Sequence, residues 1–278
     1  MFKNAFFLLL FVVSTTAIFG QIKNDTIALS AVTLKGSPIK NLLQNTAASV
    51  SVITAADINK SDGIILTSVL NKIPGLTMQQ GALNTNRITI RGIGARAQYG
   101  TNKIKAYFDG IPLTTGEGET TIDAIDLASI EKIEIIKGPN STSFGSGLGG
   151  VIQLFSRETP LLASFGKATV TFGSFGLLQQ RLSAGYDDSK TNIFSSYTDL
   201  QTDGFRANSS YNRKSLNLHG KQKMGSNGIL SFLGTFTRLK AFIPSSINET
   251  DLKNSPEKAA STWAAAQGYE SYDQSLFG

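Results

Sequence analysis

The sequence predicts a mixed α+β domain followed by a run of antiparallel β-strands. Between Ala47 and Glu158, short segments that alternate apolar and polar residues surround one stretch with helical spacing. From Phe165 onward the spacing is that of strands alone, and polar clusters separate the segments. A short apolar run at the N-terminus predicts that the chain is exported.

The first twenty residues predict a secretory signal peptide. Lys3 precedes an apolar run from Ala5 to Val13, which is shorter than the roughly 20 residues that a membrane-spanning helix needs. We expect cleavage near Gly20. No later stretch of the sequence is long and apolar enough for such a helix, so a membrane protein with this sequence would have to cross the bilayer with strands.

Residues 21–46 predict a polar, extended tail. Within it, Asp25-Thr26-Ile27-Ala28-Leu29 alternates polar and aliphatic side chains. An exposed segment of this kind can add as a strand to the edge of a partner's sheet. The same five residues also fit an ordinary edge strand or a linker, and the sequence leaves these interpretations open.

The domain from residue 47 to residue 158 begins with a strand, a helix and a second strand. Ser49 to Thr54 alternates as a strand. Ile88 and Ile90 give the later strand an apolar face, while Arg87 and Arg91 place two guanidinium groups on its other face. Between the two strands, four aliphatic residues share one face of a helix: Leu66, Val69, Leu70 and Ile73.

The second half of this domain contains a hairpin and two more strands. Asp109-Gly110 is the two-residue turn of a tight hairpin, where both positions require positive φ. A short helical turn and a strand follow, in which Ile133 and Ile135 alternate with Glu134, so we expect one buried face and one solvated face. Val151 to Phe155 predicts the last short strand of the domain.

These segments resemble, in their order, the plug domain of TonB-dependent outer-membrane receptors. The resemblance rests on four motifs: TIRGIG (Thr89 to Gly94), FDGIP (Phe108 to Pro112), ASIEKIEIIKGP (Ala128 to Pro139) and FGSGLGGVI (Phe144 to Ile152). It implies that residues 47–158 are the plug and that Asp25 to Leu29 is the Ton box, which TonB grips. It also implies that residues 159–278 begin a transmembrane barrel of about 22 strands, incomplete here.

Residues 159–278 predict about five or six antiparallel strands. Turn clusters at Asp187 to Lys190 and Gly225 to Gly228 separate segments with one apolar and one polar face. That pattern is typical of a transmembrane barrel, although a soluble antiparallel sandwich has the same alternation; the preceding plug favours the barrel. Since bacterial barrels have at least about eight strands, we expect a longer protein, with Ile243 to Gly278 as a long extracellular loop.

Nothing in the sequence favours an enzyme, a cofactor or a resident metal. The absence of cysteine excludes disulfides and thiolate metal sites, and the lone His219 is expected to be structural. Gly145 to Gly150 lacks the Lys-Ser/Thr of a phosphate-binding loop. The net charge of +6 is scattered, so we expect a solvated surface and no nucleic-acid partner. Two carboxylate pairs lie in loops without a predicted pocket: Asp123 with Asp126, and Glu117 with Glu119.

A binding function fits the plug loops better. In the resembled family the apical plug loops face outward and help to form the ligand site. The residues that we assign to this site combine a guanidinium group, an amide, an aromatic ring and two carboxylates: Arg96, Gln98, Tyr99, Glu117 and Glu119. A guanidinium fork suits the carboxylates or catecholates of a ferric chelate. Arg87 and Arg91 are expected to anchor the plug to carboxylates of the barrel wall.

The resemblance implies active transport of a ferric siderophore or a similar iron chelate across the outer membrane of a Gram-negative bacterium. TonB, with its inner-membrane energising complex, would couple this uptake to the proton gradient, and the barrel would face outer-membrane lipid. Residues 21–46 are too short for the extra N-terminal domains of signalling receptors or many glycan importers. The alternatives are uptake of cobalamin, another metal complex or a glycan, a non-transporting receptor or adhesin, and a soluble secreted binding protein.

Overall fold

Two sheets dominate the computed structural model: a five-stranded sheet within residues 49–156 and a six-stranded sheet within residues 164–277. The structure describes residues 48–61, 63–82, 85–95, 101–115, 118–122, 125–139, 144–145, 147–225 and 228–278. All of these belong to one compact unit that begins at Thr33. The predicted signal peptide and the segment from Asp25 to Leu29 lie outside the described residues.

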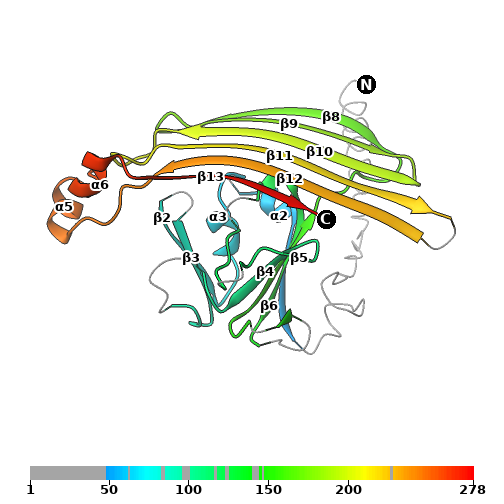
Figure 1. The fold of residues 1–278 in the computed structure, drawn as a ribbon, viewed down its shortest axis with the longest axis horizontal. Coiled ribbons are helices and arrows are strands. Elements are labelled where there is room, and N and C mark those ends of the chain that lie inside the picture. Colours follow the sequence, from blue (N-terminus) through cyan, green and yellow to red (C-terminus); the bar gives the residue numbers. More distant parts are fainter. Residues whose placement is uncertain are drawn as a thin grey trace, which may run out of the picture. The chain divides into compact units, whose positions relative to one another are not determined.

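The five-stranded sheet belongs to the predicted plug and has the order β1-β6-β7-β4-β5 (Figure 1). Its strands are β1 (Ser49–Thr54), β4 (Ile104–Phe108), β5 (Ile111–Pro112), β6 (Ile130–Lys137) and β7 (Gly150–Ser156). The β4–β7 pair is parallel and the others are antiparallel. Asp109 and Gly110 connect β4 to β5 with φ values of 46° and 85°, which confirms the predicted hairpin turn.

Short helices and a two-stranded sheet complete the plug: α2 (Ala55–Asn59), α3 (Thr67–Leu70), β2 (Leu76–Ala82), β3 (Thr85–Ile90) and the 3-10 turn η3 (Leu127–Ser129). The helix predicted over Leu66 to Ile73 is shorter in the structure, since α3 ends at Leu70, but Leu66, Val69 and Leu70 of the predicted apolar face are buried. No helix within the described residues is long and apolar enough to span a membrane.

The plug has one aliphatic core between its sheet and its helices. Fully buried members include Phe108, Ile122 and Ile152, and the core extends to Leu233 of the six-stranded sheet. Burial of apolar surface contributes roughly 25 cal/mol per Å². This core therefore holds the short plug strands together, although several of them have few backbone partners of their own.

The expectation of a solvated face on β6 is wrong. Four consecutive residues from Ile133 to Ile136 are buried, and Glu134 among them is only 1% exposed. Residues on both faces of β6 are therefore buried, and β6 is a central strand with β1 and β7 as its neighbours in the sheet. The Glu134 carboxylate lies 2.5 Å from Lys132 Nζ, and this pairing offsets part of the cost of burying a charge.

The six-stranded sheet, which we call the wall, is a chain of antiparallel neighbours from β8 to β13 (Figure 1). Its strands are β8 (Ser164–Phe172), β9 (Leu178–Asp187), β10 (Thr191–Thr202), β11 (Tyr211–Met224), β12 (Gly228–Phe242) and β13 (Tyr269–Phe277). The predicted turn clusters connect β9 to β10 and β11 to β12.

The two faces of the wall are the reverse of those in a soluble sandwich. Its buried face is rich in hydroxyl and amide groups: Ser196, Thr198, Ser215, Asn217, Thr235 and Thr237. Its exposed face carries large apolar side chains: Leu182, Tyr197, Leu216, Phe232 and Phe236. A polar inner face and an apolar outer face characterise transmembrane barrels. The structure therefore favours the barrel over the soluble alternative.

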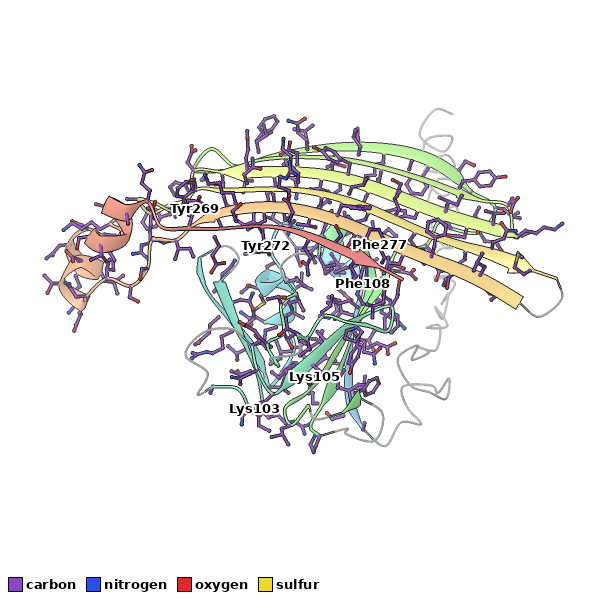
Figure 2. The ribbon with its side chains drawn as sticks, in the orientation of Figure 1. Lys103, Lys105, Phe108, Tyr269, Tyr272 and Phe277 are labelled. Atoms are coloured by element: carbon purple, nitrogen blue, oxygen red, sulfur yellow. The ribbon has the colours of Figure 1, made fainter. Side chains whose placement is uncertain are left out.

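The expectation that Ile243 to Gly278 is a single extended loop is wrong at its C-terminal end. Two short helices, α5 (Glu249–Asn254) and α6 (Ser261–Ala266), precede β13, which pairs along β12. Figure 2 shows Tyr269, Tyr272 and Phe277 spaced along this strand. Tyr272 packs against a buried cluster with Leu200, whereas Phe277 contacts Phe236 on the exposed face with ring centroids 5.1 Å apart. The polar residues between these aromatic residues concealed the strand alternation of Tyr269 to Phe277 in the sequence.

Candidate functional site

The predicted ligand loops are only partly described. Arg96, Gln98, Tyr99 and Glu117 lie outside the described residues. Glu119 is exposed in a tight turn, where the Thr115 N–H donates to its carbonyl oxygen at 2.8 Å. The neighbouring hydroxyls of Thr114 and Thr120 are 2.7 Å apart and hold the base of this turn. The structure thus presents Glu119 at the surface, and it does not test the other four residues of the predicted site.

Arg87 lies within β3 and Arg91 directly follows this strand, and both contact other residues of the plug. Arg87 Nη1 donates to the Ala95 carbonyl at 3.2 Å, and its Nη2 donates to Gln79 on β2. The Arg91 N–H donates to the Gly75 carbonyl at 2.7 Å, and its side chain is exposed. Burial, and then the positive charge of Arg91, lower the pKa of Lys137. This corner of the plug is therefore positively charged.

A buried polar contact between plug and wall is centred on Asp126, directly before η3. Its carboxylate is 0% exposed and accepts a hydrogen bond of 2.6 Å from the Thr198 hydroxyl of β10. Arg213 of β11 is 3.4 Å away and also buried, and Arg181 of β9 is 3.9 Å away. One carboxylate therefore faces side chains from three consecutive wall strands.

More cationic side chains surround this carboxylate than it can neutralise alone. Arg157, which follows β7, has its pKa lowered by burial and then by the charge of Arg181, while Glu131 and Asp126 act in the opposite direction. Arg181 also donates to the Gly63 carbonyl at 3.1 Å. We call Asp126, Glu131, Arg157, Arg181 and Arg213 the interface charge cluster.

A second group of polar contacts joins the plug to the wall along the connecting chain. Lys221 Nζ lies 2.5 Å from Glu158. The Thr159 hydroxyl donates to the Ile193 carbonyl at 2.6 Å, and Asn192 Nδ2 donates to the Thr159 carbonyl at 2.7 Å. These contacts fix the point at which the chain passes from β7 to β8.

The cavity that lies between the plug and the wall near β2 is too small for a metal chelate. A cavity of about 20 Å³ lies between Gln80 of the plug and Arg213 of the wall, together with Leu127, Leu200 and Tyr211. A volume of this size holds about one water molecule. In the part of the chain that the structure describes, no group of three or more metal-ligating side chains comes together.

The residues considered for catalysis occupy structural positions where they are described. His219 is buried on β11 with Phe194 and Leu233 as its strand partners. Asp126 contacts wall residues, and Asp123 lies outside the described residues. Gly150 of the Gly145 to Gly150 segment packs closely, because a Cβ there would lie 2.3 Å from the Ile136 carbonyl oxygen, whereas a Cβ on Gly145 would have nothing within 4 Å. Close packing, as expected, explains Gly150.

Comparisons with known proteins agree with this architecture. Residues 42–151 match the family described as the TonB-dependent receptor plug domain. The iron-regulated outer membrane virulence protein of Vibrio cholerae is 33% identical over 42% of this chain and 18% of its own length. The vitamin B12 transporter BtuB of Vibrio vulnificus is 27% identical over 49% of this chain and 21% of its own.

A solved structure extends the likeness beyond the plug. The ferric citrate transporter FecA superposes with a TM-score of 0.65 at 18% identity, over 77% of this chain and 34% of its own. The chain thus spans about a fifth of the length of the two relatives and about a third of FecA. Residues 42–151 are thus similar to the plug domain of TonB-dependent receptors, and the likeness to FecA extends this fold to the strands that follow.

Proposed function

We propose that this chain is part of a receptor that actively transports a ferric siderophore or a similar iron chelate across the outer membrane. The observation that carries the proposal is a plug domain seated by buried polar contacts on a wall that is polar inside and apolar outside. A plug inside a wall of this kind closes a pore, so passage of a ligand requires the plug to rearrange.

Coupling to the inner membrane would act through the N-terminal tail. We propose that TonB, with its energising complex, adds to Asp25, Thr26, Ile27, Ala28 and Leu29 as a strand and pulls on the tail. These residues precede β1, an edge strand whose only partner in its sheet is β6. A pull on the tail would therefore reach the plug first at a strand with a single neighbour.

The iron chelate is the preferred ligand because the Vibrio cholerae relative is named as iron-regulated. In this proposal Arg96, Gln98, Tyr99, Glu117 and Glu119 contribute to the ligand site on the outer side of the plug. Arg87 and Arg91 would pair with carboxylates of the wall, and Arg91 has an exposed side chain for this role. The receptor would bind and move its ligand without chemical conversion, and so would not be an enzyme.

A vitamin B12-type ligand is the second candidate. The BtuB relative of Vibrio vulnificus favours it, and its match covers slightly more of this chain than the iron-regulated relative does. Both ligands are metal complexes that are too large for simple diffusion through a closed plug. The two candidates therefore share one mechanism and differ in the loops that recognise the ligand.

Deletion of Thr26 to Leu29 in the full-length receptor tests the proposed coupling. We expect cells with the deletion to bind a radiolabelled ferric chelate at the surface and to accumulate none of it. A deletion of equal length from residues 33–36, which spares the proposed coupling segment, is the matched control and should leave uptake intact. Unchanged uptake after deletion of Thr26 to Leu29 would refute the coupling role.

A further inference from the structure

Transport requires part of the plug to move, and the contacts of Asp126 indicate which part stays in place. Asp126 is held from both directions. Its carbonyl oxygen accepts hydrogen bonds from the Ser129 N–H at 2.9 Å and the Ser129 hydroxyl at 2.7 Å, which fixes the backbone before η3. Its carboxylate is held by Thr198 and Arg213 of the wall. A short, rigid plug segment is thus tied to the wall by one side chain.

Separating this contact is costly because its charges are buried. Charge-assisted hydrogen bonds are about twice as strong as neutral ones, and a low-dielectric surrounding strengthens them further. The exposed fractions of the Asp126 and Arg213 side chains are 0% and 5%. Loss of Asp126 would remove the carboxylate that lies 3.4 Å from Arg213 and 3.9 Å from Arg181, and it would also remove one of the negative charges near Arg157.

The contacts near β2 are of a different kind. There the side chain of Gln80 pairs with Thr67 inside the plug, and Asn71 pairs with the backbone of Met78. A cavity of about 20 Å³ is lined by Gln80 and Arg213. The plug is thus tied to the wall at η3 through a buried carboxylate, whereas these β2 side chains make hydrogen bonds within the plug.

We propose that Asp126 is a positioning residue that keeps the segment from Ile125 to Ser129 on strands β9 to β11 throughout the transport cycle. The path of the ligand then opens on another side of the plug. This inference rests on the proposed transport function, because it assigns the fixed side of a plug that moves. It predicts that the interface at Thr198 stays closed to water while ligand passes.

The resting state is tested first, in the full-length receptor in cells. Residues 1–278 lack cysteine, so Ser215→Cys adds a thiol reporter; Ser215 is 1% exposed and pairs with Thr198 across β10 and β11. Adding Asp126→Asn removes one partner of a buried ion pair, which weakens the contact that covers this thiol. The rate of thiol labelling should therefore rise by about tenfold or more. The matched control is Asp273→Asn, whose ion pair with Arg238 lies on the exposed face, and it should leave labelling unchanged.

A milder variant keeps the test decisive if Asp126→Asn fails to reach the membrane. Thr198→Val removes one hydroxyl while it preserves shape and every charge. It should also raise labelling of Ser215→Cys, by less than Asp126→Asn does. Labelling that stays at the resting rate in both variants, or in the one that assembles, would overturn the anchor.

The transport cycle is tested with Ser215→Cys alone, using ferric citrate and ferrioxamine as probes. Labelling should be equal in cells that take up a probe and in cells whose proton gradient is collapsed by an uncoupler. A rise that requires both probe and gradient would show that the contact opens, and would overturn the proposal. If the wild type accumulates neither probe, that result counts against the proposed function alone, and the resting comparison still decides on the anchor.

Discussion

Replacement of Gly150 by alanine tests how the FGSGLGGVI segment builds the plug. Gly150 begins β7 with a φ of 138°, which residues with a side chain rarely adopt. A Cβ there would lie 2.3 Å from the Ile136 carbonyl oxygen and 3.2 Å from Ile90 Cδ1. The first of these contacts is with the backbone of the neighbouring strand, so a change of rotamer cannot relieve it.

The loss of stability expected for Gly150→Ala has two sources, the backbone conformation and the steric overlap of the added Cβ. The backbone conformation costs about 1–3 kcal/mol for a residue other than glycine, and overpacking adds about 1–3 kcal/mol. Together they amount to about 2–6 kcal/mol, against the roughly 5–15 kcal/mol by which a typical domain is stable. Gly110→Ala is the matched control, because Gly110 has a φ of 85° and nothing within 4 Å of an added Cβ. It should cost only about 1–2 kcal/mol.

Urea unfolding of the isolated plug, residues 47–158, measures both variants on one scale. We expect this fragment to fold by itself, because its aliphatic core lies largely within it. The difference in the free energy of unfolding between Gly150→Ala and Gly110→Ala isolates the clash with Ile136. Equal destabilisation by the two alanines would refute the reasoning, since the clash would then contribute nothing.

Two further predictions concern the same fragment. Phe108 (Figure 2) is 0% exposed, so Phe108→Ala should lower the free energy of unfolding by about 3–5 kcal/mol. Leu148 is exposed, so Leu148→Ala should change it by about 0.5 kcal/mol or less. Comparable losses of stability in the two variants would contradict the assignment of Phe108 to the core. Hydrogen bonds from the hydroxyl and then the N–H of Thr54 hold the pKa of Asp57 below its usual 3.8. Asp57→Asn should therefore lower the free energy of unfolding by about 1 kcal/mol at neutral pH. This difference between variant and wild type should vanish as pH falls through the lowered pKa, because the carboxylate is then protonated. A difference that persists in acid would exclude the carboxylate as its source.

Local pattern predicted the elements whose environment is local. The strand from Ser49 to Thr54 and the Asp109-Gly110 turn occur at the predicted residues, because alternation and turn chemistry depend on near neighbours. Glu134 did not follow its pattern, since burial of a strand face depends on what packs above and below the sheet, which alternation within one segment does not reveal. The last strand was missed because Tyr269 to Phe277 gains its partner from β12 across a long connection.

The interface charge cluster could not be predicted from any single segment. Asp126 precedes an aliphatic strand, and Arg181 and Arg213 lie in the region where the sequence predicted antiparallel strands, without a role of their own in that prediction. A buried carboxylate between two arginines is visible only when the plug and the wall are placed together. The signal in the sequence was a charged residue within a region of predicted strands that have one polar face. Such residues need partners when that face is covered.

Uptake of radiolabelled iron tests the central claim most directly. Cells that lack their own chelate receptors would carry the full-length receptor and be supplied with a panel of ferric chelates, with labelled cobalamin in parallel. The account predicts that iron from at least one chelate accumulates, and that an uncoupler or deletion of Thr26 to Leu29 stops it. Accumulation of cobalamin alone would show that cobalamin, and not an iron chelate, is the ligand. Surface binding of a chelate or of cobalamin without energy-dependent accumulation would contradict the transport function.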